Sequence, residues 1–334
     1  MESNRVVSVI IQDGQGGIEV VSKLNTCSLI VHLNKKPKFG FLGSQYGVLF
    51  CISSVFRILK ENDVVMTNLP IHHMVFSLIN LFYKRKHIAV EHGPWVFAIG
   101  AKTHQFVSWF YQFWLKKSKL DVVCVSKDLF AMYNLIRNNN HYIPNAICDF
   151  ESVKSHSSID DVLRFVFVGR FDYQKDVQLA IEAYLSFKRA SNKKCIFDLY
   201  GSGKDMEGIL EKYSSYDDIN FKGYNNNARN LLCNYDICLV TSRFEGLPGI
   251  VLESLYAGCR VVTTPFISGL LELAVYPNIR VSRNRDIISI VESISSILDV
   301  EYDPLAVRVS LERTYSQPLI KNEYSKLFIK NECY

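Results

Sequence analysis

Short apolar stretches of strand type alternate with helical stretches along the whole chain, and this alternation restricts the fold more than any other feature. A strand, a helix and a second strand in succession form a parallel pair, so the pattern predicts an α/β architecture with parallel sheets. In the first half we expect strands Arg5–Gln12, Ser28–Leu33, Asp63–Thr67, His87–Glu91, Asp121–Val125 and His141–Ile143, with helices at about 51–60, 71–83, 103–118 and 127–137. In the second half we expect strands Arg164–Val168, Cys195–Tyr200, Asn220–Lys222, Asp236–Val240 and Arg260–Thr263, with helices at about 176–190, 205–214, 227–233, 249–257 and 285–298.

The chain of 334 residues is long enough for two domains, each with its own core. The polar segment Asp149–Asp161 has no apolar periodicity, which predicts a linker. We therefore expect one Rossmann-like domain over residues 1–150 and a second over 160–314. Apolar residues from Tyr315 to Lys330 follow a helical period and predict a last helix within 315–334. Ligands of such domains bind at the carboxyl ends of the parallel strands, so the site is expected in a cleft between the two sheets.

The net charge of +5 is unevenly distributed. Residues 1–150 carry 16 Lys and Arg against 9 Asp and Glu, which gives +7, whereas residues 151–334 carry 22 against 24, which gives −2. A basic first half favours an anionic partner such as phosphate, anionic lipid or nucleic acid, and charge alone does not separate these.

Cysteine and histidine spacing argues against a metal protein. Nine cysteines show no C-x-x-C pair and indicate reduced thiols of a cytoplasmic protein. The eight histidines show no metal-binding spacing, and no Asp-x-Asp pair is present to hold a metal on a diphosphate. We expect neither metal nor other cofactor. The first strand follows the start of the sequence directly, without a signal peptide, and the longest apolar stretches are too short to span a bilayer.

Two glutamates lie eight residues apart in the run Arg243-Phe-Glu-Gly-Leu-Pro-Gly-Ile-Val-Leu-Glu253. An apolar strand precedes the run, and a helix is expected to begin near Pro248 or Gly249. A strand, a glycine-containing turn and a helix N-terminus form an anion site, because unpaired backbone N–H groups point at the turn. Carboxylates at that site can accept hydrogen bonds from sugar hydroxyls, so the combination favours a nucleotide sugar. The alternative is a surface loop followed by an ordinary amphipathic helix.

The run closely resembles the E-x7-E signature of retaining glycosyltransferases of family 4. This family has the GT-B fold, in which two Rossmann-like domains face each other across a cleft. The resemblance implies that Glu253 binds the nucleotide ribose. It implies that Glu245 holds the donor sugar together with the backbone of Gly246, Leu247, Pro248 and Gly249. In this family the last helix commonly crosses back onto the first domain, which implies the same for residues 315–334.

A second motif, Gly169-Arg-Phe-Asp-Tyr-Gln-Lys175, follows the apolar strand of the second domain. Arg170 can bind phosphate oxygens with two hydrogen bonds and Lys175 adds a mobile point charge, so the two cations suit a diphosphate. The alternative is a solvated cluster in which they pair with Asp172 and Asp176. The motif is similar to the family's G-R-x4-K element, except that Asp176 replaces the glycine that usually follows the lysine.

Two loops of the first half match further family landmarks. Gly16 and Gly17 resemble the family's G-G-x-E loop, which approaches the donor phosphates, and they do not complete a dinucleotide-binding fingerprint. His92 follows the fourth strand and corresponds to the family's first-domain histidine beside the donor sugar and acceptor. Ser126 is expected to cap the helix that starts at Lys127.

The segment His104–Lys119 combines six aromatic residues within positions 106–114 with lysines at 116, 117 and 119. An amphipathic helix of this kind either lies on an anionic membrane or packs its aromatic residues onto the sheet. Because one buried face does not need six aromatic residues, we expect some of them to be exposed.

The sequence therefore predicts a cytoplasmic, retaining, metal-independent glycosyltransferase. Its expected partners are a nucleoside diphosphate sugar, with UDP favoured, and a lipid-linked or lipopolysaccharide-type glycan acceptor, and not nucleic acid. Peripheral binding to the inner face of a membrane follows if the aromatic helix lies on the lipid, and does not follow if that helix packs onto the sheet. Two alternatives remain open: a GT-B nucleotide-sugar 2-epimerase, and a non-catalytic subunit that binds nucleotide sugars.

Overall fold

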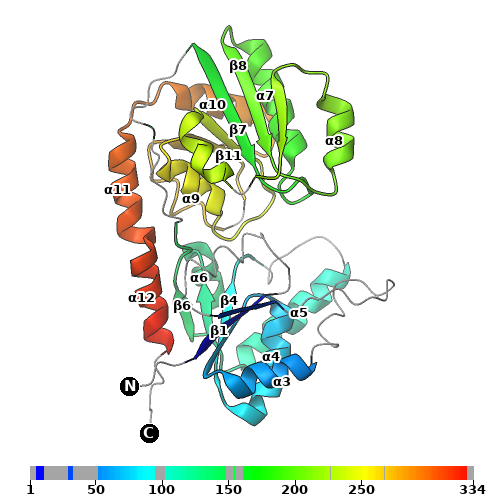
Figure 1. The fold of residues 1–334 in the computed structure, drawn as a ribbon, viewed down its shortest axis with the longest axis vertical. Coiled ribbons are helices and arrows are strands. Elements are labelled where there is room, and N and C mark those ends of the chain that lie inside the picture. Colours follow the sequence, from blue (N-terminus) through cyan, green and yellow to red (C-terminus); the bar gives the residue numbers. More distant parts are fainter. Residues whose placement is uncertain are drawn as a thin grey trace. The chain divides into compact units, whose positions relative to one another are not determined.

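The computed structural model describes residues 5–10, 29–32, 52–94, 102–147, 154, 161–225, 227–266 and 268–328. The chain divides into two compact units, one comprising residues 1–146 and 317–334 and the other residues 147–316. Each unit is built on a six-stranded sheet, counted within the described residues, and all strand pairs are parallel (Figure 1).

The sheet of the first unit has the order β2-β1-β3-β4-β5-β6. Helices α3 and α4 cover strands β1 and β3 through a cluster that includes Val7, Leu59, Val65 and Phe76. The strands are β1 (Val6–Ile10), β2 (Leu29–His32), β3 (Val64–Thr67), β4 (Lys86–Glu91), β5 (Asp121–Cys124) and β6 (Asn140–Tyr142). The helices are α3 (Ile52–Glu61), α4 (Pro70–Tyr83), α5 (Lys102–Lys117), α6 (Lys127–Asn134) and α12 (Gln317–Phe328).

Residue types at the helix ends explain where these helices start and stop. Helix α4 begins with Pro70, whose fixed φ suits the first helical position. It ends at Lys84, which has a left-handed φ of 52° and donates its amide to the carbonyl of Asn80. Ser126 caps α6 as predicted, because its hydroxyl accepts a hydrogen bond from the amide of Leu129 at 3.3 Å.

The sheet of the second unit has the order β12-β11-β10-β7-β8-β9, the doubly wound order of a Rossmann domain. Strand β7 pairs with β8 on one side and β10 on the other, so the strand order reverses between β7 and β10. The strands are β7 (Val162–Val168), β8 (Lys194–Tyr200), β9 (Ile219–Gly223), β10 (Ile237–Val240), β11 (Arg260–Thr263) and β12 (Ile279–Val281). The helices are α7 (Val177–Ala190), α8 (Met206–Tyr213), the 3-10 helix η2 (Ala228–Asn234), α9 (Gly249–Tyr256), α10 (Ile287–Leu298) and α11 (Pro304–Tyr315).

Aromatic side chains dominate the core of the second unit. Phe165 of β7 contacts Tyr184 of α7 edge-on at a ring separation of 5.2 Å, and Tyr184 lies 5.0 Å from Phe197 of β8. All three are fully buried, and such aromatic pairs stabilise a fold beyond the area they bury. This core fixes the positions of β7 and its neighbours, and therefore the loops that leave their carboxyl ends.

The structure departs from the sequence predictions in three elements. The expected helix 227–233 is the 3-10 helix η2, and both β12 and α11 were missed. Strand β12 has three residues, too few for a periodic signal. The sequence does contain a start signal for helix α11, an Asp followed by a Pro. In the structure the Asp303 carboxylate caps the helix by accepting a hydrogen bond from the amide of Leu305 at 2.9 Å, and Pro304 follows the cap.

The structure describes only part of the predicted linker and only some of the cysteines that were predicted to be reduced thiols. The expected linker lies outside them except for Lys154 and Asp161. Within the described residues, Cys124, Cys195, Cys233, Cys238 and Cys259 are free thiols. None of the helices in this part of the chain is long and apolar enough to cross a membrane.

Candidate functional site

The two motifs of the second unit meet where the strand order of its sheet reverses. Strands β7 and β10 are neighbours, so the loop after Val168 and the loop after Val240 leave the same edge side by side. Gln174 joins the two loops: its carbonyl accepts a hydrogen bond from the Arg243 amide at 2.8 Å, and its side-chain amide donates to the Phe244 carbonyl at 3.0 Å. Ligands of doubly wound sheets bind at this position.

Lys175 and Glu245, predicted to contact different parts of a donor, are direct partners. The Lys175 ammonium lies 2.6 Å from Glu245 Oε1, and the two side chains are 18% and 10% exposed. This places a cation and a carboxylate at one point of the site. A diphosphate can bind the ammonium there, and a sugar hydroxyl can donate a hydrogen bond to the carboxylate.

Arg170 lies in the same loop and is 61% exposed. Its Nε atom is 3.3 Å from Asp172, and its guanidinium donates a hydrogen bond to the Gln174 side chain at 2.8 Å. The expected alternative of a solvated ion pair therefore holds for Arg170 with Asp172. A solvated arginine remains available to an anionic ligand, since an exposed pair of this kind contributes little stability.

The turn from Gly246 to Gly249 leads directly into helix α9. Leu247 and Pro248 are buried, and the helix begins at Gly249, where its first amide groups have no partner within the helix. The Ser268 hydroxyl donates a hydrogen bond to the Gly246 carbonyl at 2.8 Å, which holds the turn in place. A glycine-containing turn thus leads into a helix N-terminus, an arrangement that binds anions in other proteins.

Glu253 lies on the second turn of α9 beside Arg229 of η2. The Arg229 guanidinium is 3.6 Å from Glu253 Oε1, and both side chains are largely buried. Arg229 was not predicted, because no sequence pattern relates η2 to α9. Its positive charge lies beside the Glu253 carboxylate, close to the turn.

Asp176, the departure from the family motif, occupies a left-handed backbone conformation with φ 48° and ψ 58°. Glycine adopts this region freely, and Asp is one of the residues that tolerate it. Its carboxylate accepts hydrogen bonds from Arg243 at 2.6 Å and from Arg285. Asp176 therefore keeps the backbone turn of a glycine and adds an anchor for two arginines that the sequence did not reveal.

We expect Asp176→Asn to lower the free energy of unfolding by about 1–3 kcal/mol, because hydrogen bonds between charged groups are lost while Asn still tolerates the left-handed backbone. Urea unfolding measures the change. Asp217→Asn is the control, since Asp217 is an exposed acid of the same unit. Equal midpoints for wild type and Asp176→Asn would show that the carboxylate is not needed.

In the first unit, Gly16 and Gly17 lie outside the described residues, whereas His92 is placed at the end of β4. His92 Nε2 is 2.9 Å from the side-chain oxygen of Asn68, and the Asn68 amide donates to the Ser8 hydroxyl at 3.1 Å. Burial lowers the pKa of His92 to about 4, so the ring is neutral at neutral pH. Within the first unit, Asn68 therefore fixes the ring of the predicted histidine.

In the first unit, a cluster of buried polar side chains connects strands β3 and β4 with helices α4 and α5. The Thr67 hydroxyl is 2.6 Å from His73 Nδ1 and 2.8 Å from His87 Nε2, and His73 Nε2 is 3.5 Å from Glu91. Burial raises the pKa of Glu91 to about 7, and Tyr111 donates a hydrogen bond to it. Within the described part of the chain, no group of three or more His, Cys, Asp or Glu side chains is arranged so that it could hold a metal ion. The cluster is part of the core.

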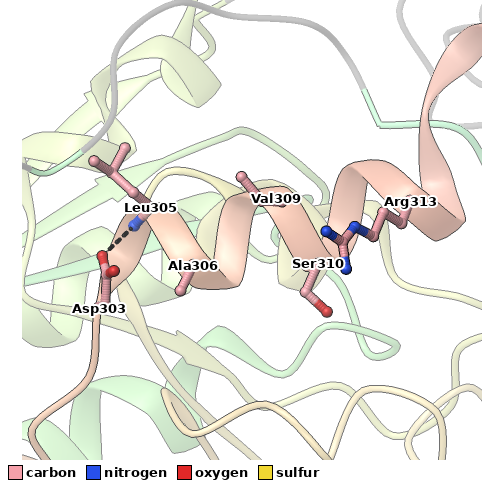
Figure 2. A pocket seen from close by; sticks show the side chains of 6 residues that line it. All are labelled: Asp303, Leu305, Ala306, Val309, Ser310 and Arg313. Carbon is pink, nitrogen blue, oxygen red and sulfur yellow. Dashed lines mark hydrogen bonds between the residues drawn. The ribbon is translucent and has the colours of Figure 1, made fainter.

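A hollow in the second unit lies along one face of helix α11 (Figure 2). The side chains that line it are mostly short or apolar, and the Asp303 carboxylate is already bonded to the Leu305 amide as the helix cap. None of the predicted donor-binding residues is among its lining, which consists of Asp303, Leu305, Ala306, Val309, Ser310 and Arg313. The hollow is therefore separate from the predicted site.

Residues 149–310 match the family model for Glycosyl transferases group 1, and this segment contains both motifs of the second unit. The chain is 28% identical over 151 residues to the N-acetylgalactosamine-N,N'-diacetylbacillosaminyl-diphospho-undecaprenol 4-alpha-N-acetylgalactosaminyltransferase of Campylobacter jejuni, covering 44% of this chain and 40% of that protein. It is 25% identical over 227 residues to an uncharacterized glycosyltransferase of Methanocaldococcus jannaschii, covering 61% of this chain and 58% of that protein. The chain thus matches about half the length of these relatives.

Solved structures resemble nearly the whole chain. HepE of Anabaena in complex with UDP and glucose gives a TM-score of 0.75 at 12% identity, covering 97% of this chain and 99% of that chain. Sucrose-phosphate synthase of Thermosynechococcus elongatus gives 0.76 at 14% identity, covering 98% of each chain. The lipopolysaccharide outer core galactosyltransferase WaaB gives 0.69 at 14% identity, covering 96% and 98%. These likenesses confirm the predicted GT-B fold class.

Proposed function

We propose that the protein is a retaining glycosyltransferase of family 4 that transfers a hexose or N-acetylhexosamine from a nucleoside diphosphate sugar, with UDP as the favoured nucleotide. The observation that carries the proposal is the 2.6 Å contact between Lys175 and Glu245 at the carboxyl edge of the sheet, where its strand order reverses. The group 1 match over residues 149–310 supports it, since the match includes Arg170, Lys175, Glu245 and Glu253.

In the proposed reaction, the bond between the sugar C1 and the diphosphate oxygen breaks, and C1 bonds to the acceptor oxygen on the same face. The acceptor proton moves to the departing diphosphate, so no protein base is required. Arg170 and Lys175 stabilise the charge that develops on the diphosphate, and Glu245 with the Gly246–Gly249 turn positions the sugar. Glu253 binds the ribose. The roles of His92 and of Gly16–Gly17 rest on the family resemblance.

For the acceptor we propose a lipid-linked or lipopolysaccharide-type glycan, and for the reaction a place on the cytoplasmic side of a membrane. The Campylobacter relative supports this, because its name describes an acceptor on diphospho-undecaprenol. The name of WaaB likewise refers to lipopolysaccharide, although its likeness to this chain is one of fold.

A thermal-shift panel of UDP, GDP, ADP and their sugars tests the donor. We expect a UDP-sugar to raise the melting temperature, because a ligand that binds only the folded protein stabilises it, by about 2.7 kcal/mol at a hundred times its Kd. We also propose that the donor binds without a metal ion, so the shift should persist in excess EDTA. A panel without any shift would contradict the donor proposal, and a shift that needs Mg²⁺ or Mn²⁺ would contradict metal independence.

A further inference from the structure

Helices α4 and α5 of the first unit expose large apolar side chains to solvent. Phe82 is 82% exposed and Trp109 is 60% exposed. Trp109 stacks on Phe113, one turn further along α5, at a ring separation of 6.0 Å. The exposed set, which we call the α4–α5 face, consists of Leu78, Leu81 and Phe82 on α4 and Trp109, Phe110 and Phe113 on α5.

Both helices also have a separate buried side. On α4 the buried positions include His72 and Phe76, and on the described part of α5 they include Ser108, Tyr111 and Leu115. At 100° per residue, the exposed positions of each helix lie on the opposite side from these. The buried sides meet, since the rings of His73 and Tyr111 stack at 6.3 Å. The two helices are therefore neighbours in the first unit (Figure 1), and each leaves the side opposite its buried residues exposed.

The charged residues along α4, α5 and the segments that directly follow them are mostly basic. Between Asp63 and Asp121 the sequence contains a single acidic residue, Glu91, and this residue is buried. Arg85 forms an ion pair with Asp63 at 3.6 Å, and Lys86 forms one with Asp121 at 2.5 Å. Four lysines of the region are exposed and form no ion pair within the described residues: Lys84, Lys116, Lys117 and Lys119.

We propose that the α4–α5 face binds the surface of an anionic lipid bilayer. Aromatic and leucine side chains that project from a helix enter the boundary between head groups and acyl chains, and lysines beside them bind anionic head groups. Nucleic acid would use the positive charge and leave the leucines of α4 without a partner. A lipid surface uses both components. The absence of surface acids along these helices removes the repulsion that would oppose it.

The vesicle binding does not depend on catalysis, but its biological role rests on the proposed function. A lipid-linked acceptor is confined to the plane of the membrane. A transferase that holds the same surface meets this acceptor in two dimensions, without having to extract it into water.

Co-sedimentation with vesicles tests the proposal. The 334-residue chain is mixed at low salt with phosphatidylcholine vesicles that contain or lack phosphatidylglycerol. We expect binding to the anionic vesicles alone, weakened by added salt. The triple variant Lys116→Glu, Lys117→Glu, Lys119→Glu should bind on the order of a hundredfold more weakly, because each basic residue near the surface contributes about fivefold. Trp109→Ser with Phe113→Ser should reduce binding at high salt as well.

Matched controls separate this surface from net charge and from general hydrophobicity. The triple variant Lys193→Glu, Lys194→Glu, Lys204→Glu makes the same change in charge on exposed residues of the second unit. Leu135→Ser removes an exposed apolar side chain of the first unit that lies outside α4 and α5. Both controls should bind like wild type. The proposal is overturned if wild type does not bind anionic vesicles, or if the two lysine variants bind equally.

Sedimentation velocity without lipid addresses another occupant of the face, a second copy of the chain. We expect a monomer. A stable dimer that Trp109→Ser with Phe113→Ser dissociates would assign the face to self-association and overturn the proposal. Donor-induced thermal shifts of the same variants keep the two proposals distinct, since a loss of vesicle binding should leave the donor shift unchanged.

Discussion

Lys175→Ala is expected to lower turnover by on the order of a hundredfold or more, as the removal of a preorganised charge stabiliser does in other enzymes. The Lys175 ammonium contacts Glu245 at 2.6 Å, and in the proposed reaction it binds the departing diphosphate. Arg170→Ala is expected to act in the same direction, because its exposed guanidinium lies in the same loop. The measurement is the rate of sugar transfer from the donor that the thermal-shift panel selects.

Lys188→Ala is the matched control for these variants. Lys188 also forms an ion pair in the second unit, with Asp218 at 2.8 Å, but it lies on α7 away from both loops. Its turnover should equal that of wild type. Near-normal transfer by the double variant Arg170→Ala, Lys175→Ala would contradict the proposal that these two residues stabilise the departing diphosphate. Epimerisation of the donor by wild type without an acceptor would favour the 2-epimerase instead.

The second large effect concerns stability in acid. We expect His72→Leu to be more stable than wild type at neutral pH and to gain about a further 2 kcal/mol at pH 5. His72 is fully buried, and neither of its ring nitrogens has a hydrogen-bond partner among the described residues. Leaving a buried polar group unsatisfied costs about 1–3 kcal/mol, which the apolar leucine avoids.

The direction of the pH effect follows from the pKa shift. Burial lowers the pKa of His72 from 6.5 to about 4, so between these values the unfolded chain binds the proton and the folded protein does not. Stability is therefore lost as the pH falls through this window. Glu91 acts in the opposite direction, because burial raises its pKa from 4.5 to about 7. Comparing the variant with wild type cancels the contribution of Glu91.

Urea unfolding at pH 7.5 and pH 5 measures both parts of this prediction. His72→Gln is the control, since it keeps a polar side chain and does not titrate. It should lose the acid sensitivity of His72 without the gain at neutral pH. If wild type, His72→Leu and His72→Gln show the same pH dependence, the histidine is not responsible.

The second unit was the more predictable part of the fold. Its strands are apolar runs bounded by turn residues, and parallel strands must be joined by helices, so their order in the sequence implied the class of sheet. Strand β12 was missed because three residues give no periodic signal. Helix α11 was missed because its apolar periodicity is weak, although Asp303 and Pro304 mark its start. The 3-10 form of η2 was missed as well, since its tight turn is set by tertiary context.

The sequence predicted the two loops of the candidate site, but it did not predict which of their side chains contact each other. Lys175 and Glu245 are 70 positions apart, and their contact depends on β7 and β10 being neighbours in the sheet. Spacing within a motif carries no information about such pairing. For the same reason the sequence did not reveal that Arg229, Arg243 and Arg285 support the site through Glu253 and Asp176.

The contact between Lys175 and Glu245 has a consequence for the order of events in a catalytic cycle. In the proposed reaction, a nucleoside diphosphate that binds the ammonium separates it from its carboxylate, and the carboxylate then needs a new partner. An intact donor supplies one through its sugar hydroxyls. The product left after transfer does not, so the lysine and glutamate compete with it by pairing again. The ion pair would thus favour retention of the complete donor and release of the spent nucleotide.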